Sequence, residues 1–164
     1  MTAGKPQHLT LRINGDNVDV LAPAHWTLLE ILRYKLALTG SKQGCDKGDC
    51  GACTVLIDGE AQLACLLLAH NCVGKEITTI EGLAGPDGLD PVQDAFDKTG
   101  ALQCGFCQPA MMLSARALLA RDNDPNREAI DDALGGNLCR CTGYTKIIDA
   151  VLLAAKTLRQ SDGQ

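Results

Sequence analysis

Cysteine is the residue through which this chain of 164 residues can do most chemistry, because it contains nine of them. Thiolates are ligands for soft metal ions and for iron–sulfur clusters. The sequence shows no nucleophile paired with a base at a motif spacing, no phosphate-binding loop and no nucleotide-binding fingerprint. We therefore expect metal or redox chemistry at the thiols and no substrate pocket in this chain. Eight of the nine fall into two groups: Cys45, Cys50, Cys53 and Cys65, and Cys104, Cys107, Cys139 and Cys141.

The first group has four, two and then eleven residues between successive cysteines. The intervals of four and two match the spacing of plant-type [2Fe–2S] ferredoxins. Such a cluster needs four thiolates, and backbone amides close by to hydrogen-bond its sulfides. We expect Gly44, Gly48 and Gly51 to take positive φ and to let the loop wrap tightly with its N–H groups inward. The alternatives are incidental buried cysteines or structural zinc, which usually shows two short Cys-x2-Cys pairs that this group lacks.

The second group consists of two close pairs separated by 31 residues, Cys104 with Cys107 and Cys139 with Cys141. Gly105 and Pro109 place the first pair at the start of a helix, where free amides and the helix dipole favour thiolate charge. The second pair should lie at the mouth of a helix that begins near Tyr144. Two such helix ends facing each other would make a four-sulfur cage. By spacing alone, zinc is a stronger rival for this group than for the first.

Short alternating segments predict a small β-sheet around the first group. Leu9–Ile13 and Val18–Leu21 flank an Asn-Gly turn, and Thr54–Ile57 and Ala61–Leu63 flank an Asp-Gly turn, so each pair predicts a hairpin. Glu76–Ile80 reads as a further strand.

One helix should cross this sheet. Thr27 and Glu30 form a capping-box pattern, the apolar residues that follow share one helical face, and we expect Gly40 to end the helix.

The second half of the chain has helical patterning. Glycine and proline interrupt any period over Glu81–Pro91, which marks a linker. In the last expected helix, Ile147, Ile148, Val151, Leu152, Ala155 and Leu158 form an apolar stripe that we interpret as core packing. Four helices are expected after the linker, over Val92–Lys98, Pro109–Ala120, Asn126–Leu134 and Tyr144–Arg159.

Composition restricts the setting and the partners. The net charge of −5 and the 3% of aromatic residues argue against a nucleic-acid groove and favour a protein partner. Met1–Asp16 has no apolar run of signal-peptide length, and no segment approaches the length of a membrane span. We expect a cytoplasmic, reducing setting, where clustered cysteines more often hold metal than form disulfides.

Longer motifs around both groups resemble the iron–sulfur subunit or domain of the molybdenum hydroxylases, the xanthine oxidase family. The likeness lies in Gly44–Val55 (GCDKGDCGACTV), Gln103–Cys107 (QCGFC) and Gly135–Tyr144 (GGNLCRCTGY), in this order. Within the family, Lys42–Asp46 and Tyr144–Ile148 look most like the small subunit of 4-hydroxybenzoyl-coenzyme A reductase.

The resemblance implies an α+β fold, in which an N-terminal β-grasp ferredoxin-like domain (1–82) precedes a C-terminal four-helix-bundle domain (91–160). It implies one [2Fe–2S] cluster in each domain, ligated by the two groups of cysteines. The implied partners are a large subunit with molybdopterin and a medium subunit with FAD, in a hetero-oligomer such as a dimer of heterotrimers. Electrons would pass from molybdenum through the second and then the first cluster to flavin or another acceptor, or in reverse in a reductase.

Two residues acquire roles only from this resemblance. Gln103 would contact the pterin, and Cys141 would both bind iron and approach the pterin amine. The family usually continues Cys107 with Thr-Pro-Gly, whereas this chain has Gln108-Pro109-Ala110. The extra methyl of Ala110 puts a close approach to the large subunit in question, but not the iron ligation.

The ninth cysteine, Cys72, is expected to pack in a core. The three histidines share no motif with the cysteines. Two other functions stay open at this point. A freely diffusing ferredoxin would need no motif directed at pterin, and a zinc-holding scaffold would be colourless.

Overall fold

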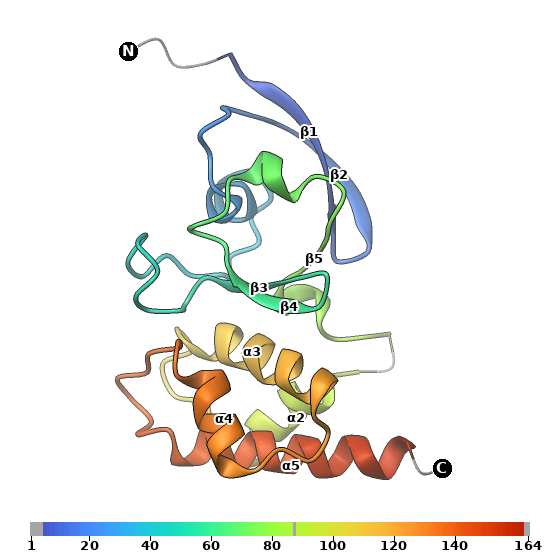
Figure 1. Ribbon diagram of the computed structural model, residues 1–164, viewed down its shortest axis with the longest axis vertical. Helices are drawn as coiled ribbons and strands as arrows, with labels where there is room; N and C mark the ends of the chain where they lie inside the picture. Colours follow the sequence, from blue (N-terminus) through green and yellow to red (C-terminus); the bar gives the residue numbers. More distant parts are fainter. Residues whose placement is uncertain (1–4, 87, 163–164) are drawn as a thin grey trace.

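The computed structural model describes residues 5–86 and 88–162, and Figure 1 shows them as two stacked halves. The sheet half contains the strands, and the helical half contains α2 to α5. Helix α3 faces the sheet half, and α5 lies on the far side of the helical half (Figure 1). The described part of the chain contains no helix that could span a membrane.

The sheet has five strands in the order β2-β1-β5-β3-β4. Both predicted hairpins are confirmed, since β1 pairs antiparallel with β2 and β3 pairs antiparallel with β4. The central strand β5 runs parallel to β1 and antiparallel to β3. The strands are β1 (Gln7–Ile13), β2 (Asp16–Ala22), β3 (Thr54–Ile57), β4 (Glu60–Leu63) and β5 (Glu76–Thr78).

Strand β5 is shorter than expected, and the prediction that it reaches Ile80 was wrong. The backbone N–H of Thr79 donates to Asn14 Oδ1 at 2.9 Å instead of continuing the ladder. A 3-10 turn over Ile80–Gly82 follows at once. The chain therefore leaves the sheet at Thr79.

The helix after the first hairpin begins as predicted and ends early. The capping box of Thr27 and Glu30 is present, and the helix continues from α1 (Leu28–Glu30) into a π-helix, η1 (Ile31–Lys35). It does not end at Gly40, because Ala37 takes a left-handed conformation (φ 55°) and the N–H of Leu38 donates to Leu32 O at 2.8 Å. These two features close the helix.

In the residues that the structure describes, the helical half contains four α-helices, as predicted. They are α2 (Pro91–Lys98), α3 (Gln108–Arg121), α4 (Arg127–Leu134) and α5 (Thr145–Asp162). Helix α5 starts one residue after Tyr144 and continues beyond Arg159. Leu152 in α5 is 43% exposed, so it does not belong to the buried stripe as expected. Ile147, Ile148, Val151 and Ala155 are buried.

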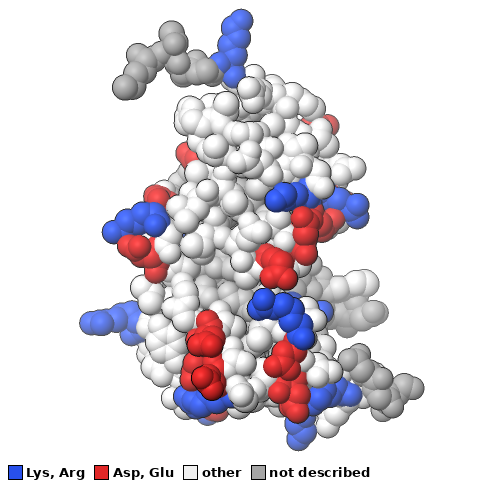
Figure 2. All heavy atoms as spheres, in the orientation of Figure 1, with Lys and Arg blue, Asp and Glu red and all other residues white. Residues whose placement is uncertain are grey.

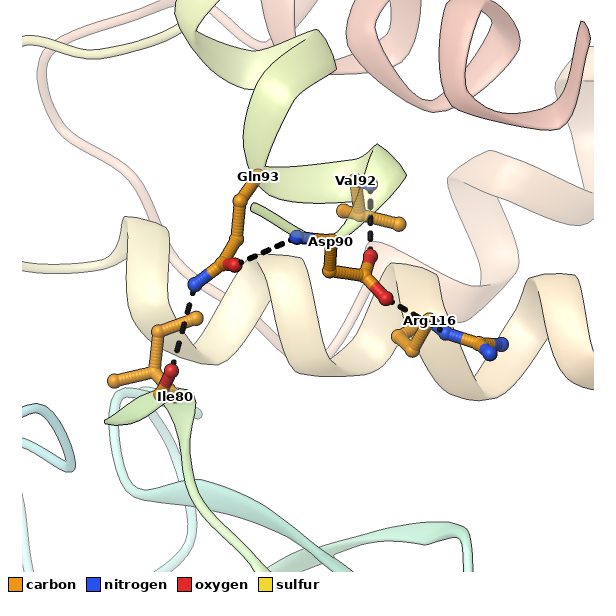
Figure 3. Close-up of polar contacts among 5 residues, drawn as sticks. All are labelled: Ile80, Asp90, Val92, Gln93 and Arg116. Atoms are coloured by element: carbon orange, nitrogen blue, oxygen red, sulfur yellow. Dashed lines mark hydrogen bonds and ion pairs between the residues drawn. The ribbon is translucent and has the colours of Figure 1, made fainter. Parts of the chain in front are cut away.

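The start of α2 is hydrogen-bonded both to Ile80, just before the linker, and to α3 (Figure 3). Asp90 caps α2 by accepting the N–H of Val92 at 2.8 Å, and its other oxygen accepts from Arg116 Nε of α3 at 3.2 Å. Gln93 accepts the N–H of Asp90 and donates to Ile80 O at 3.4 Å. These hydrogen bonds are directional, and they fix where α2 begins relative to Ile80 and to α3.

Each half has its own apolar core. The core of the sheet half is formed by side chains such as Leu11, Ile31 and Ile77, and that of the helical half by others such as Phe96 and Ile147. A third, small cluster of Leu56 on β3 with Leu113 and Ala117 on α3 joins the two halves.

Charge is mixed on the face drawn in Figure 2, where acidic and basic side chains are interspersed over the helical half. Single-sign fields steer nucleic acids to protein surfaces. This face carries no such field.

Candidate iron–sulfur sites

The first group of thiols converges where the loop after η1 meets the chain leaving β4. The thiols of Cys45 and Cys50 lie within hydrogen-bonding reach of each other, and so do those of Cys53 and Cys65. Cys50 also lies close enough to Cys65 for a thiolate there to raise the pKa of Cys50. The structure thus brings together all four members of the first group.

Backbone amides surround the outermost of these thiols. The N–H of Lys47, followed by those of Cys50 and Asp49, lowers the pKa of Cys45 to about 7. Asp46 (φ 57°) and Gly48 (φ 90°) are left-handed, which turns the loop so that these N–H groups point inward. The expected inward set of amides is confirmed at Cys45.

The three glycines of this loop do not all act in the way expected. Gly48 and Gly51 have positive φ, as predicted. Gly44 does not, and the prediction for it was wrong. A Cβ atom at Gly44 would lie 2.7 Å from the sulfur of Cys50, so this position needs the space that glycine leaves and not its conformational freedom.

The inner thiols of the first group lie in a different environment. Burial raises the pKa of Cys53 to about 12, and burial also raises the pKa of Cys50. A buried thiolate is unfavourable without a nearby positive charge, and metal ions supply such a charge. Amides at one thiol and buried thiols behind it fit a metal cluster at this position.

The second group of thiols converges where the start of α3 meets the irregular segment that leads to α5. Cys107 is the N-cap of α3, and its thiol lies within hydrogen-bonding reach of that of Cys139. Cys104 stands in the same relation to Cys141, whose pKa is raised chiefly by this neighbour. Burial raises the pKa of Cys107 to about 12. All four members of this group are also together.

Thr142 holds the sulfur of Cys139 and was not identified from the sequence. Burial raises the pKa of Cys139, but the hydroxyl of Thr142 at 3.0 Å and its N–H at 3.4 Å outweigh burial, and the net pKa is lowered. Tyr144 (φ 66°) accepts the N–H of Cys139 on its hydroxyl at 2.8 Å. The Thr-Gly-Tyr that follows Cys141 was a signal that could have indicated both contacts.

The remaining candidates lie outside both groups. Cys72 is 1% exposed and belongs to the core of the sheet half, as predicted. Within the part of the chain that the structure describes, no three His, Cys, Asp or Glu side chains converge on one metal-ion position. A [2Fe–2S] cluster would distribute the four thiolates of each group over two irons, so it does not need three ligands around a single position. The histidines His8, His25 and His70 are exposed and join neither group.

Comparison with known proteins agrees with both sites. Residues 11–71 match the model of the 2Fe-2S iron-sulfur cluster binding domain, and residues 79–152 match that of the [2Fe-2S] binding domain. A nicotinate dehydrogenase subunit of Pseudomonas putida is 45% identical over 93% of this chain and 97% of its own length. The nicotine 6-hydroxylase small subunit of Paenarthrobacter nicotinovorans is 44% identical over 99% and 100%. This chain is an iron–sulfur subunit of the molybdenum hydroxylase family.

Solved structures of two oxidoreductases share the fold. Quinoline 2-oxidoreductase from Pseudomonas putida 86 superimposes with a TM-score of 0.91 at 40% identity, over 96% of this chain and 98% of the matched chain. The aldehyde oxidoreductase of Desulfovibrio desulfuricans superimposes with a TM-score of 0.89 at 43% identity, over 94% of this chain. The match covers 17% of that protein's chain. The same fold thus occurs both as a separate subunit and within a much longer chain.

The departure from the family motif after Cys107 lies inside the protein. Ala110 is 1% exposed, so its methyl group packs within the helical half and presents almost nothing to a partner. The expected effect on the approach of the large subunit stays a prediction, and a direct contact of this methyl group plays almost no part in it. Gln108 is 2% exposed and donates to Ala101 O at 3.4 Å.

Proposed function

We propose that this iron–sulfur subunit relays electrons between the molybdopterin centre of a large subunit and an FAD subunit or another acceptor. The observation that carries the proposal is that eight thiols form two quartets. The thiol neighbours of each of these cysteines belong to its own quartet. Each bound [2Fe–2S] cluster accepts and gives up one electron at a time. The chain's own part is to ligate, to hydrogen-bond and to space the two clusters.

The two quartets support an assignment of the ligands. Backbone N–H groups at the first and Thr142 at the second stabilise negative charge on sulfur, which favours the reduced state relative to burial alone. The domains would be 1–82 for the first cluster and 91–160 for the second, with residues 1–4 outside the described part. The proposed ligands are Cys45, Cys50, Cys53 and Cys65 for the first, and Cys104, Cys107, Cys139 and Cys141 for the second.

The second cluster is the one proposed to face the large subunit. Gln103 and Cys141 are exposed, which leaves them free to meet the pterin of a partner. Phe106, Leu102 and Leu138 nearby are 45%, 43% and 57% exposed, an apolar surface suited to a protein partner. The relatives are named as subunits of dehydrogenases and hydroxylases, which supports a hetero-oligomer. A dimer of heterotrimers in the cytoplasm is the assembly that we propose.

Metal analysis and paramagnetic resonance of the purified enzyme test the proposal. We expect about four irons per chain of this subunit, two distinguishable signals after reduction, and molybdenum in the same complex. A colourless protein with zinc would favour the scaffold alternative. An iron-containing subunit that purifies alone and never with molybdenum would favour a diffusing ferredoxin.

Ligand substitutions test the assignment of the residues. Cys45→Ser should remove one paramagnetic signal and leave the other, and Cys104→Ser should remove the complementary one, because the quartets share no thiol. Each variant is the matched control of the other. Loss of both signals, or of neither, in both variants would contradict two separate sites.

A further inference from the structure

One buried side chain connects the two ligand loops. Asn137 is 4% exposed and lies two residues before Cys139. Its Nδ2 donates to the carbonyl oxygen of Gly51 at 3.0 Å and to Thr54 Oγ1 at 3.2 Å, both beside Cys50 and Cys53. Its Oδ1 accepts from Ser114 Oγ of α3 at 2.8 Å. Asn137 therefore uses both ends of its amide, and a fully satisfied buried network of this kind is rigid.

The neighbouring backbone makes a direct link between the quartets. The N–H of Leu138 donates to the carbonyl oxygen of Cys50 at 3.0 Å. Cys50 belongs to the first quartet, and Leu138 is bonded to Cys139 of the second. One hydrogen bond and the backbone of one residue thus separate a proposed ligand of one cluster from a proposed ligand of the other.

The two loops approach too closely for any side chain at Gly51. A Cβ atom there would lie 2.1 Å from the carbonyl oxygen of Gly136 and 2.9 Å from the Cα of Asn137. Gly51 also has a positive φ of 70°. The contact between the loops is therefore close-packed backbone, held by the amide of Asn137.

We propose that Asn137 is a positioning residue for electron transfer between the two clusters, because it keeps the hydrogen bond from Leu138 to Cys50 in register. The inference rests on the proposed function. Tunnelling decays faster across a gap than along covalent and hydrogen bonds, so an intact Leu138–Cys50 bond gives the faster route. With both clusters bound, one electron that moved from the second to the first would oxidise the second by one and reduce the first by one, and the reverse flow would do the opposite. No bond forms or breaks, and the N–H of Leu138 keeps its proton.

Asn137→Ala in the full-length chain with both clusters tests this role. A light pulse produces a one-electron reductant, and freeze-quenched samples follow the two paramagnetic signals over time. In the wild type we expect the ratio of the signals to reach its final value within the first samples. In Asn137→Ala the same final ratio should be reached later, because the potentials are unchanged and only the route is impaired.

Asn126→Ala is the matched control. Asn126 caps the start of α4, the helix that leads to Asn137, by accepting the N–H of Ala129 at 2.8 Å. Its substitution loosens the same helix without touching either ligand loop. We expect wild-type timing in this variant, and an equal delay would show that Asn137 acts only through general stability and would overturn the inference.

Hydrogen exchange gives a readout that needs no electron transfer. The Leu138 amide should exchange about fivefold faster in Asn137→Ala than in the wild type, the effect of weakening one hydrogen bond. Unchanged protection of Leu138 would overturn the inference. If Asn137→Ala fails to hold both clusters, Thr54→Val is the second variant, because it keeps the shape and removes the hydroxyl that accepts from Asn137 and donates to Gly51 O at 2.7 Å. It should give the same delay to a smaller degree.

The outcomes separate the inference from the function on which it rests. Two intact signals with wild-type timing in both Asn137→Ala and Thr54→Val overturn the inference alone. A wild-type chain that shows fewer than two signals overturns the proposed function and the inference with it.

Discussion

At the scale of single residues, thiols of one chemical type acquire opposite properties from their surroundings. Amides around Cys45 lower its pKa to about 7, whereas burial raises the pKa of Cys53 to about 12. Both belong to one quartet, so a cluster bound there would be hydrogen-bonded on its outer side and enclosed on its inner side. Hydrogen bonds and solvent exposure are the features that set the potential of an iron–sulfur cluster.

Cys72 provides a prediction at this scale. It is 1% exposed, and burial raises its pKa, so at pH 8 it should be overwhelmingly the unreactive thiol. In the folded, cluster-loaded chain, iodoacetamide should modify none of the nine cysteines, and after unfolding and removal of iron it should modify all of them. Mass spectrometry counts the labels.

The matched variant is Cys72→Ala, which should keep both paramagnetic signals because Cys72 lies in neither quartet. Rapid labelling of Cys72 in the native chain, or loss of a signal in Cys72→Ala, would contradict its role as a packing residue.

The eight clustered thiols could be predicted from the sequence, but the side chains that orient them could not. Spacing identifies Cys139 as a ligand because the motif is local. The contact of Asn137 with Gly51 joins residues that lie 86 positions apart, so it depends on how α3 packs against the sheet and α4 against α3. Single-sequence patterns contain no information on such a contact.

At the scale of elements, both hairpins and all four later helices could be predicted, because their signals are local turns, caps and periods. The end of the first helix could not be predicted in this way. The helix ends where Ala37 becomes left-handed, a conformation that its side chain disfavours and that tertiary packing imposes. Glycine at position 40 fits a helix end by its residue type, but its reason for being glycine lies elsewhere in the fold.

Gly40→Ala tests that reason. A Cβ atom at this position would lie 2.2 Å from Ile80 Cγ2 and 2.8 Å from Glu81 Oε1, so the loop and the start of the linker would have to move apart. We expect a loss of about 1–3 kcal/mol in the free energy of unfolding, the range for overpacking. Denaturant unfolding monitored by circular dichroism measures it.

Gly85→Ala is the matched control, because a Cβ atom there would meet nothing within 4 Å. Its unfolding free energy should stay within about 0.5 kcal/mol of the wild type, as for ordinary surface substitutions. Equal stability of the two variants would show that the approach of Gly40 to the linker is not tight in solution.

At the scale of the whole molecule, two separate cores are held in one arrangement. The cluster of Leu56, Leu113 and Ala117 is small beside the cores of the two halves. It lies against the same face of α3 that carries Ser114, the hydroxyl partner of Asn137. Apolar contact and the polar network therefore act together to fix the spacing between the quartets.

Leu113→Ala should loosen this contact specifically. Leu113 is 1% exposed, and truncation of a buried leucine costs about 2–5 kcal/mol of unfolding free energy. The cavity would open between α3 and β3, so the amides of β3 should exchange faster as well as those of α3. Leu119→Ala removes the same atoms from a side chain that is 5% exposed in the core of the helical half alone. This control should destabilise the chain comparably and leave the amides of β3 protected. Faster exchange of β3 in both variants, or in neither, would contradict a contact between the two halves that depends on Leu113.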